Sequence, residues 1–119
     1  MNAGEETGSG PPEIDWTKAG ELRDDVGGEA FREVVDLFLV EVEEALEALM
    51  HGPGLEAQLH FLKGAALNLG FTEFAALCQQ GETLAGAGRA RDVRLHPLRA
   101  AYGRARDHFL AEWEWRLAA

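Results

Sequence analysis

The sequence contains a single cysteine, Cys78, so no disulfide can form within the chain. That composition favours a reducing compartment. No apolar run approaches the roughly 20 residues that a membrane span requires, and the first residues lack the charged and apolar regions of a signal peptide. We therefore expect a cytoplasmic protein with no membrane association.

Basic residues are scarce in the first half of the chain. Residues 1–50 hold 14 acidic and 3 basic side chains, whereas residues 51–119 hold 7 acidic and 8 basic ones, for a net charge of -10. This balance argues against a nucleic-acid partner. A local basic run could contact a phosphate or an acidic partner, but a solvated helix face that neutralises the acidic half is the favoured interpretation. The run consists of Arg89, Arg91, Arg94, Arg99, Arg104 and Arg106.

Metal-ligand spacings are also missing. No Glu-x-x-His or His-x3-His pattern links His51, His96 or His108 to His60, so no metal site is predicted. Nor is there a nucleotide-binding glycine loop, and no cofactor is expected. Cys78 falls on the inner stripe of an expected helix, where a thiol behaves as a small apolar filler rather than as a redox group.

Apolar residues recur at helical spacing, and no segment shows the alternation of a strand. Residues 1–13, rich in Gly, Glu, Ser and Pro, are expected to form a disordered leader. Residues 14–117 are expected to form one all-α domain, an up-and-down antiparallel four-helix bundle with an additional short N-terminal helix. The expected helices cover residues 15–25, 29–50, 55–68, 73–87 and 92–117.

Single residues mark several helix ends. Asp15 is expected to cap the first helix and Thr72 the fourth, while Gly70 suits the left-handed position that ends the third. Trp113 and Trp115 lie two residues apart and point in nearly opposite directions. Only one of them can enter the core.

A histidine, a lysine and a glycine share one face of the expected helix 55–68. The core stripe of that helix consists of Leu59, Leu62, Ala66 and Leu69. His60 lies about 100° around the helix from Leu59 and should be partly exposed. Lys63 and Gly64 follow one turn later, so an ammonium lies beside the imidazole and bare backbone leaves room next to it.

The run His60-Phe61-Leu62-Lys63-Gly64, with Leu69-Gly70, Leu77-Cys78 and Glu82, resembles the signature of histidine-containing phosphotransfer (HPt) domains. The similarity extends over roughly residues 14–116. It implies a phosphorelay intermediate that accepts a phosphoryl group on His60 from a receiver-domain aspartate and passes it to another receiver. The implied partners are response-regulator receiver domains and a hybrid histidine kinase. Such a protein is a monomeric carrier without a nucleotide site rather than an enzyme, and the receiver supplies the metal ion for transfer.

Carried onto this chain, the resemblance assigns roles that ordinary chemistry supports. A neutral imidazole is a good nucleophile, Lys63 would neutralise phosphoryl oxygens, and Gly64 would give access. Glu82 would accept the Nδ1 proton of His60 and so orient the ring, and Gln79 would support the imidazole or the phosphoryl group. Alternatively, Glu82 and Gln79 are solvated helix residues.

Receiver docking needs an apolar surface around His60. The candidates are Phe61, Leu67, Leu22, Val26 and Phe31, although Phe61 or Phe31 could belong to the core instead. A second class of function is a helical adaptor that binds a kinase or receiver without being phosphorylated. The joint presence of His60 and Lys63 favours the carrier.

Overall fold

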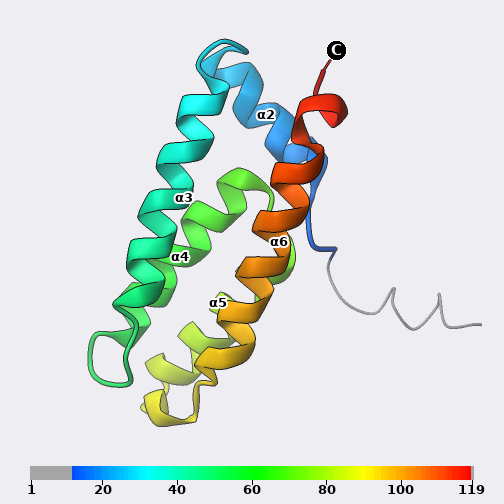
Figure 1. Ribbon diagram of the computed structural model, residues 1–119. Helices are drawn as coiled ribbons and strands as arrows, with labels where there is room; N and C mark the ends of the chain where they lie inside the picture. The colour runs from blue at the N-terminus through cyan, green and yellow to red at the C-terminus, as the bar shows by residue number, and fades with distance from the viewer. Residues whose placement is uncertain (1–11, 119) are drawn as a thin grey trace, which may run out of the picture.

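The computed structural model describes residues 12–118, which form five α-helices, one short 3-10 helix and no strand. The all-α prediction is therefore confirmed for this part of the chain. Most of the expected leader lies outside the described residues. The elements are α2 (Trp16–Val26), α3 (Phe31–Glu47), α4 (Leu55–Leu69), α5 (Thr72–Gly86), η1 (Ala90–Asp92) and α6 (Leu95–Arg116) (Figure 1).

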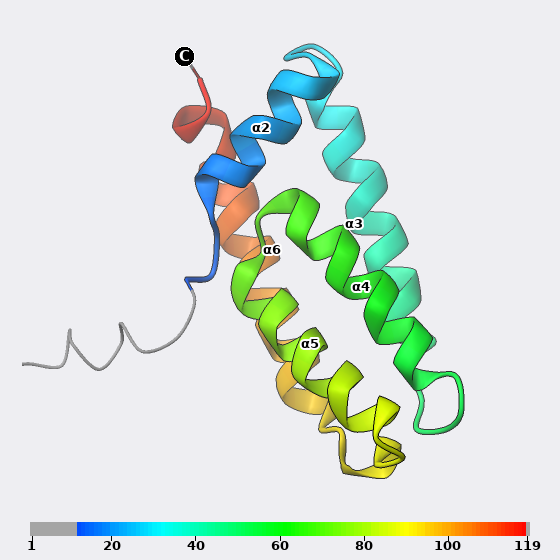
Figure 2. The same cartoon turned by 180° about the vertical axis from the view of Figure 1, so that it is seen from behind.

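Side-chain contacts show how the long helices are paired. Arg32, near the start of α3, lies 3.0 Å from Glu114 near the end of α6. Farther along, the Tyr102 hydroxyl donates to Glu43 at 2.8 Å. The two helices thus run in opposite directions, and Figures 1 and 2 show the direction reversing at each step from α3 to α6. In both views α2 lies near the start of α3 and the end of α6.

The core is built from the apolar stripes of all five helices, with aromatic rings at its centre. Phe71, Phe74 and Phe109 are almost fully buried, and the Phe74 and Tyr102 rings meet edge to face with centroids 5.4 Å apart. In α6 the side chain at the core margin is Trp113, whereas Trp115 is 64% exposed. Trp113 is therefore the tryptophan that packs against the core, and Trp115 is the one that stays outside it.

The junction of α4 with α2 depends on Gly70. This residue has φ 83°. Its N–H donates to the Leu67 carbonyl, and the N–H of Phe71 donates to the Ala66 carbonyl. This pair of bonds is a Schellman motif and confirms the predicted C-cap. Its carbonyl accepts from the Asp15 N–H at 2.7 Å, and a Cβ on Gly70 would overlap the Asp15 carbonyl oxygen. Since Asp15 also caps α2 as predicted, through Thr17 N–H at 3.0 Å, α2 is fixed against the end of α4.

The prediction that Thr72 caps α5 is wrong. Thr72 is the first residue of α5, and its hydroxyl accepts no N–H of the helix but donates to the Pro12 carbonyl at 2.6 Å. The reason is that α5 starts directly after the Gly70 turn, which leaves Phe71 at the cap position. Thr72 therefore ties the segment before α2 to α5.

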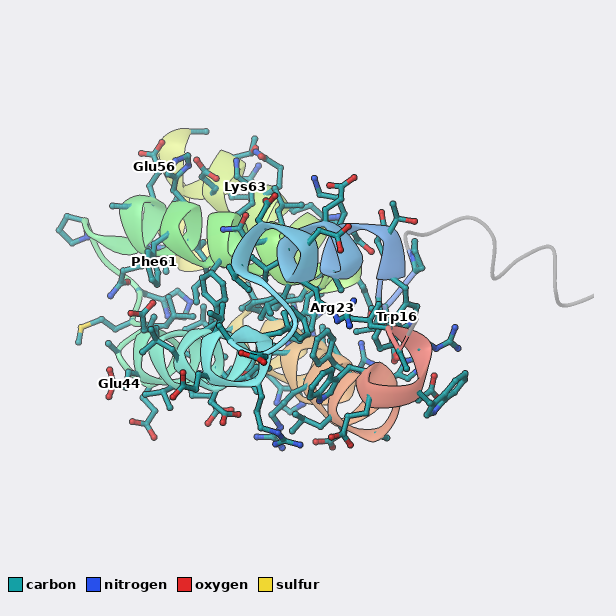
Figure 3. All side chains as sticks on the ribbon, turned by 90° about the horizontal axis from the view of Figure 1, so that it is seen from above. Trp16, Arg23, Glu44, Glu56, Phe61 and Lys63 are labelled. Atoms are coloured by element: carbon teal, nitrogen blue, oxygen red, sulfur yellow. The ribbon has the colours of Figure 1, made fainter. Side chains whose placement is uncertain are left out.

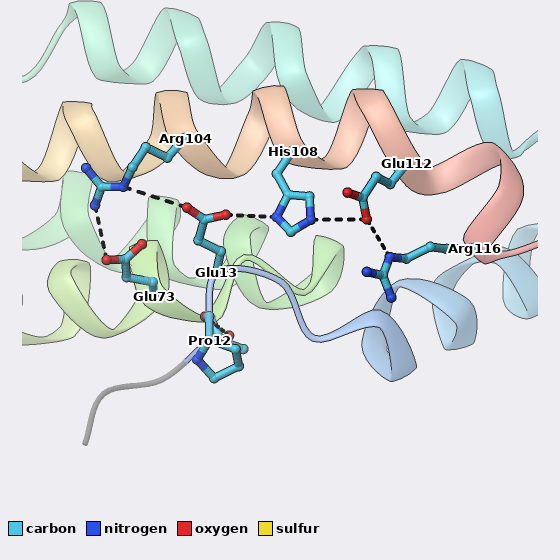
Figure 4. Close-up of polar contacts among 8 residues, drawn as sticks. Pro12, Glu13, Glu73, Arg104, His108, Glu112 and Arg116 are labelled. Atoms are coloured by element: carbon cyan, nitrogen blue, oxygen red, sulfur yellow. Dashed lines mark hydrogen bonds and ion pairs between the residues drawn. The ribbon is translucent and has the colours of Figure 1, made fainter. Parts of the chain in front are cut away.

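Glu13, expected in the leader, contacts α6 (Figure 4). Its carboxylate lies 2.8 Å from His108 Nδ1, while Nε2 of the same ring lies 3.2 Å from Glu112. A neutral imidazole has one N–H, so only the imidazolium donates to both carboxylates. Consistently, the pKa of His108 is raised, chiefly by its hydrogen bond to Glu13.

Candidate functional site

His60 is turned outward by the packing of α4. The stripe residues Leu59, Leu62, Ala66 and Leu69 are completely buried, as predicted. One residue further around the helix, the His60 side chain is 69% exposed. A partner protein can therefore reach the imidazole without any rearrangement of the core.

Glu82 on α5 contacts both residues of the predicted pair. Its Oε2 lies 2.9 Å from His60 Nδ1, and its Oε1 lies 3.1 Å from the Lys63 ammonium. The pKa of Glu82 is lowered, chiefly by the hydrogen bond from Lys63 and secondarily by that from His60, against an opposing effect of burial. Because a carboxylate has no proton to give, Nδ1 must donate, which leaves the lone pair of a neutral ring on Nε2.

Gln79 contacts Lys63 rather than His60. Its Oε1 accepts from the Lys63 ammonium at 2.7 Å, and its Nε2 donates to the Thr83 hydroxyl at 3.1 Å. Because an ammonium can only donate, the amide oxygen must face Lys63, and the amide nitrogen is left to donate to Thr83. Thr83 was not among the predicted site residues, although its position one turn after Gln79 on the same helix indicates that the two side chains can meet.

Gly64 leaves open space one turn beyond His60. Apart from its chain neighbours and the backbone of its own helix, a Cβ built on Gly64 meets no heavy atom within 4 Å. Packing within the chain therefore does not require a glycine at this position. The free volume lies on the helix face that also carries the imidazole.

Helices α4 and α5 run antiparallel through the site. Glu56 lies against Gly86, His60 bonds Glu82, and Lys63 bonds Gln79, so positions later in α4 pair with positions earlier in α5. Figure 3 shows Lys63 and Phe61 leaving α4 on different sides, with Phe61 toward α3. The polar site and the aromatic side chain thus occupy neighbouring faces of one helix.

Four of the five predicted docking residues reach the surface to some degree. Phe61 and Leu67 are 49% and 42% exposed, and Leu22 and Val26 on α2 are half-buried against the core. Phe31, in contrast, is completely buried, with its ring 5.2 Å from that of Trp113. Its inclusion as a docking residue is wrong, because the start of α3 turns this side chain inward under α6.

Cys78 lies below the site in the core. Burial, reinforced by the charge of Glu82, raises the pKa of its thiol to about 12, as expected for an apolar filler. Among residues 12–118 no three His, Cys, Asp or Glu side chains are grouped to hold a metal ion. Over the same residues, none of the helices has the length and apolar character to cross a bilayer.

Comparison with known proteins identifies the family. The family model of the Hpt domain matches residues 33–114, more than half of the chain. No curated protein and no solved structure matches. The matched range contains α4 and α5 with His60, Lys63 and Glu82, while α2 precedes it. The chain therefore belongs to the Hpt domain family, whose members carry phosphoryl groups in two-component signalling.

Proposed function

We propose that this protein is a phosphorelay intermediate in which His60 receives a phosphoryl group from the aspartyl phosphate of a receiver domain and returns it to the aspartate of another. The observation that supports this most is the bond of 2.9 Å between Nδ1 and Glu82 on a side chain that is otherwise 69% exposed. The bond selects the nucleophilic nitrogen, and the exposure makes it reachable.

In the transfer step, the Nε2 lone pair attacks phosphorus. An N–P bond forms, the bond between phosphorus and the aspartate oxygen breaks, and the aspartate leaves as a carboxylate. The Nδ1 proton stays on the ring, where the Glu82 carboxylate balances the positive charge that the ring acquires. The reverse step to a second receiver restores the neutral imidazole.

Lys63 neutralises the phosphoryl oxygens. Its ammonium is held 2.7 Å from Gln79 and 3.1 Å from Glu82, one turn from His60. A flexible four-carbon stem lets this ammonium turn toward a phosphoryl group on the neighbouring imidazole. Gln79, supported by Thr83, acts as the resting partner of Lys63.

The scaffold for this site is an up-and-down antiparallel bundle of α3 to α6, to which α2 is added. Receivers dock over Phe61 and Leu67, bordered by Leu22 and Val26 from α2. Phosphoryl transfer consists largely of positioning and charge neutralisation, and the receiver contributes its metal ion and acidic pocket. In this proposal the protein is a cytoplasmic, monomeric carrier rather than an enzyme.

The test is transfer from a panel of phosphorylated receivers of the same cell. Wild-type protein should acquire acid-labile phosphate from at least one receiver, and His60→Gln should acquire none. His96→Gln is the matched control, because His96 is exposed on α6 and outside the site. Failure of every receiver to label the wild type, or equal labelling of His60→Gln, would refute the proposal. If a receiver binds both proteins but labels neither, the chain is the non-phosphorylated adaptor.

A further inference from the structure

Gly81 occupies a close contact between the buried faces of α4 and α5. It is buried, and a Cβ built on it would lie 2.8 Å from Leu59 Cδ1 and 3.1 Å from Val93 Cγ1. Both neighbours are themselves buried, Leu59 completely. The backbone of α5 therefore comes closer to α4 than any residue with a side chain would allow.

This contact lies directly beneath the polar site. Leu59 and Gly81 immediately precede His60 and Glu82, the two residues whose side chains bond across the same helix pair at 2.9 Å. We propose that Gly81 is a positioning residue: the absence of a side chain sets the separation of α4 and α5 at which Glu82 reaches His60 Nδ1. The effect of Gly81 on phosphoryl transfer rests on the function proposed above, whereas its effect on the hydrogen bond between His60 Nδ1 and Glu82 does not.

The distances indicate how much the bond depends on this approach. Carbon atoms in contact prefer separations of about 3.5–4.0 Å, so a methyl on Gly81 would need about 0.7 Å of relief from Leu59. If α5 moves away by that amount, the bond of 2.9 Å lengthens to the limit of hydrogen bonding. If Leu59 moves instead, it must leave its rotamer in a filled core.

Gly86, the last residue of α5, has a contact as short, because its Cβ would lie 2.8 Å from Glu56 Oε2. That atom is the end of an exposed, flexible side chain that can move aside, so Gly86 does not set the helix separation. A Cβ on Gly64 in α4 or on Gly103 in α6 meets no atom within 4 Å. Gly103 therefore provides a matched control, since Gly103→Ala changes helix propensity in the same way as Gly81→Ala but forces no helices apart.

The experiment compares Gly81→Ala with Gly103→Ala in the full chain by ¹⁵N NMR of the histidine rings, without any phosphoryl donor. We expect the His60 Nδ1–H signature of the wild type to be lost in Gly81→Ala and retained in Gly103→Ala. Transfer from a receiver should fall roughly tenfold to a hundredfold in Gly81→Ala alone. Wild-type ring signals and a wild-type transfer rate in Gly81→Ala would overturn the proposal.

A double variant, Gly81→Ala with Leu59→Val, keeps the test decisive if Gly81→Ala does not fold. The shorter valine removes the Cδ1 atom that the new methyl would meet. Recovery of the wild-type ring signals supports the proposal, whereas an altered ring in a folded double variant, or failure to fold, overturns it. Because these signals are read in unphosphorylated protein, they stay informative even if no receiver labels His60.

Discussion

Replacement of Gly64 by alanine should stabilise the fold and impair the transfer. A glycine in a helix interior costs about 0.5–1 kcal/mol relative to alanine, and a Cβ at this position meets no atom within 4 Å, so no clash offsets the gain. For a domain of this size the melting temperature should rise by roughly 2–6 °C. The new methyl lies on the His60 face, where an incoming phosphoryl group needs the space.

The loss of transfer follows from the same geometry. Crowding of an extra methyl into a filled contact costs about 1–3 kcal/mol, which corresponds to a roughly 5- to 150-fold slower transfer. The assay pairs thermal unfolding with the rate of phosphoryl transfer from a receiver. Gly103→Ala, also free of contacts at its Cβ, should show the gain in stability alone. Equal transfer rates for Gly64→Ala and Gly103→Ala would refute the steric role.

Three further predictions concern charge and docking. His108 has a raised pKa, so the stability that its imidazolium gains from Glu13 is present below the unfolded pKa of about 6.5 and is lost as pH rises through the folded pKa. The difference in free energy of unfolding between the wild type and His108→Asn should therefore shrink as the pH rises. A difference that does not change with pH would show that a protonated His108 does not stabilise the fold. Glu82→Gln should slow transfer while far-UV circular dichroism stays native, because the carboxylate that balances the ring charge is gone; an unchanged rate would argue against the orienting role. Leu67→Glu should weaken receiver binding and change stability by less than about 0.5 kcal/mol, whereas Leu37→Glu, on an exposed site of α3, should leave binding intact; equal binding by both variants would remove Leu67 from the docking surface.

Local patterns in the sequence were sufficient to predict how α4 presents His60. The stripe from Leu59 to Leu69 fixed which face is buried, and the helix period then placed His60 outside it. Gly70 was predictable as a cap because few other residues adopt its positive φ. The pairing of His60 with Glu82 came from the family resemblance, and the structure brings the two side chains within hydrogen-bond distance.

Features that depend on which helices become neighbours were not predictable in the same way. Phe31 would lie on an apolar stripe of α3 whether it faced a partner or the core. It is a core residue because α6 lies over the start of α3 and brings Trp113 against its ring. Glu13 belongs to a segment without apolar periodicity, yet His108 and Arg104, distant in sequence, hold it. Gln79 faces Lys63 because the antiparallel register of α4 and α5 sets that pair.

The nitrogen that carries the phosphate shows directly whether Glu82 selects Nε2 of His60 as the nucleophile. After transfer from a receiver, ³¹P and ¹⁵N NMR of protein with labelled histidine identifies the nitrogen bound to phosphorus. We expect a single phosphoramidate at Nε2 of His60, with the Nδ1 proton still bonded to Glu82. Phosphate on Nδ1 of His60, on another histidine or on a carboxylate would contradict it.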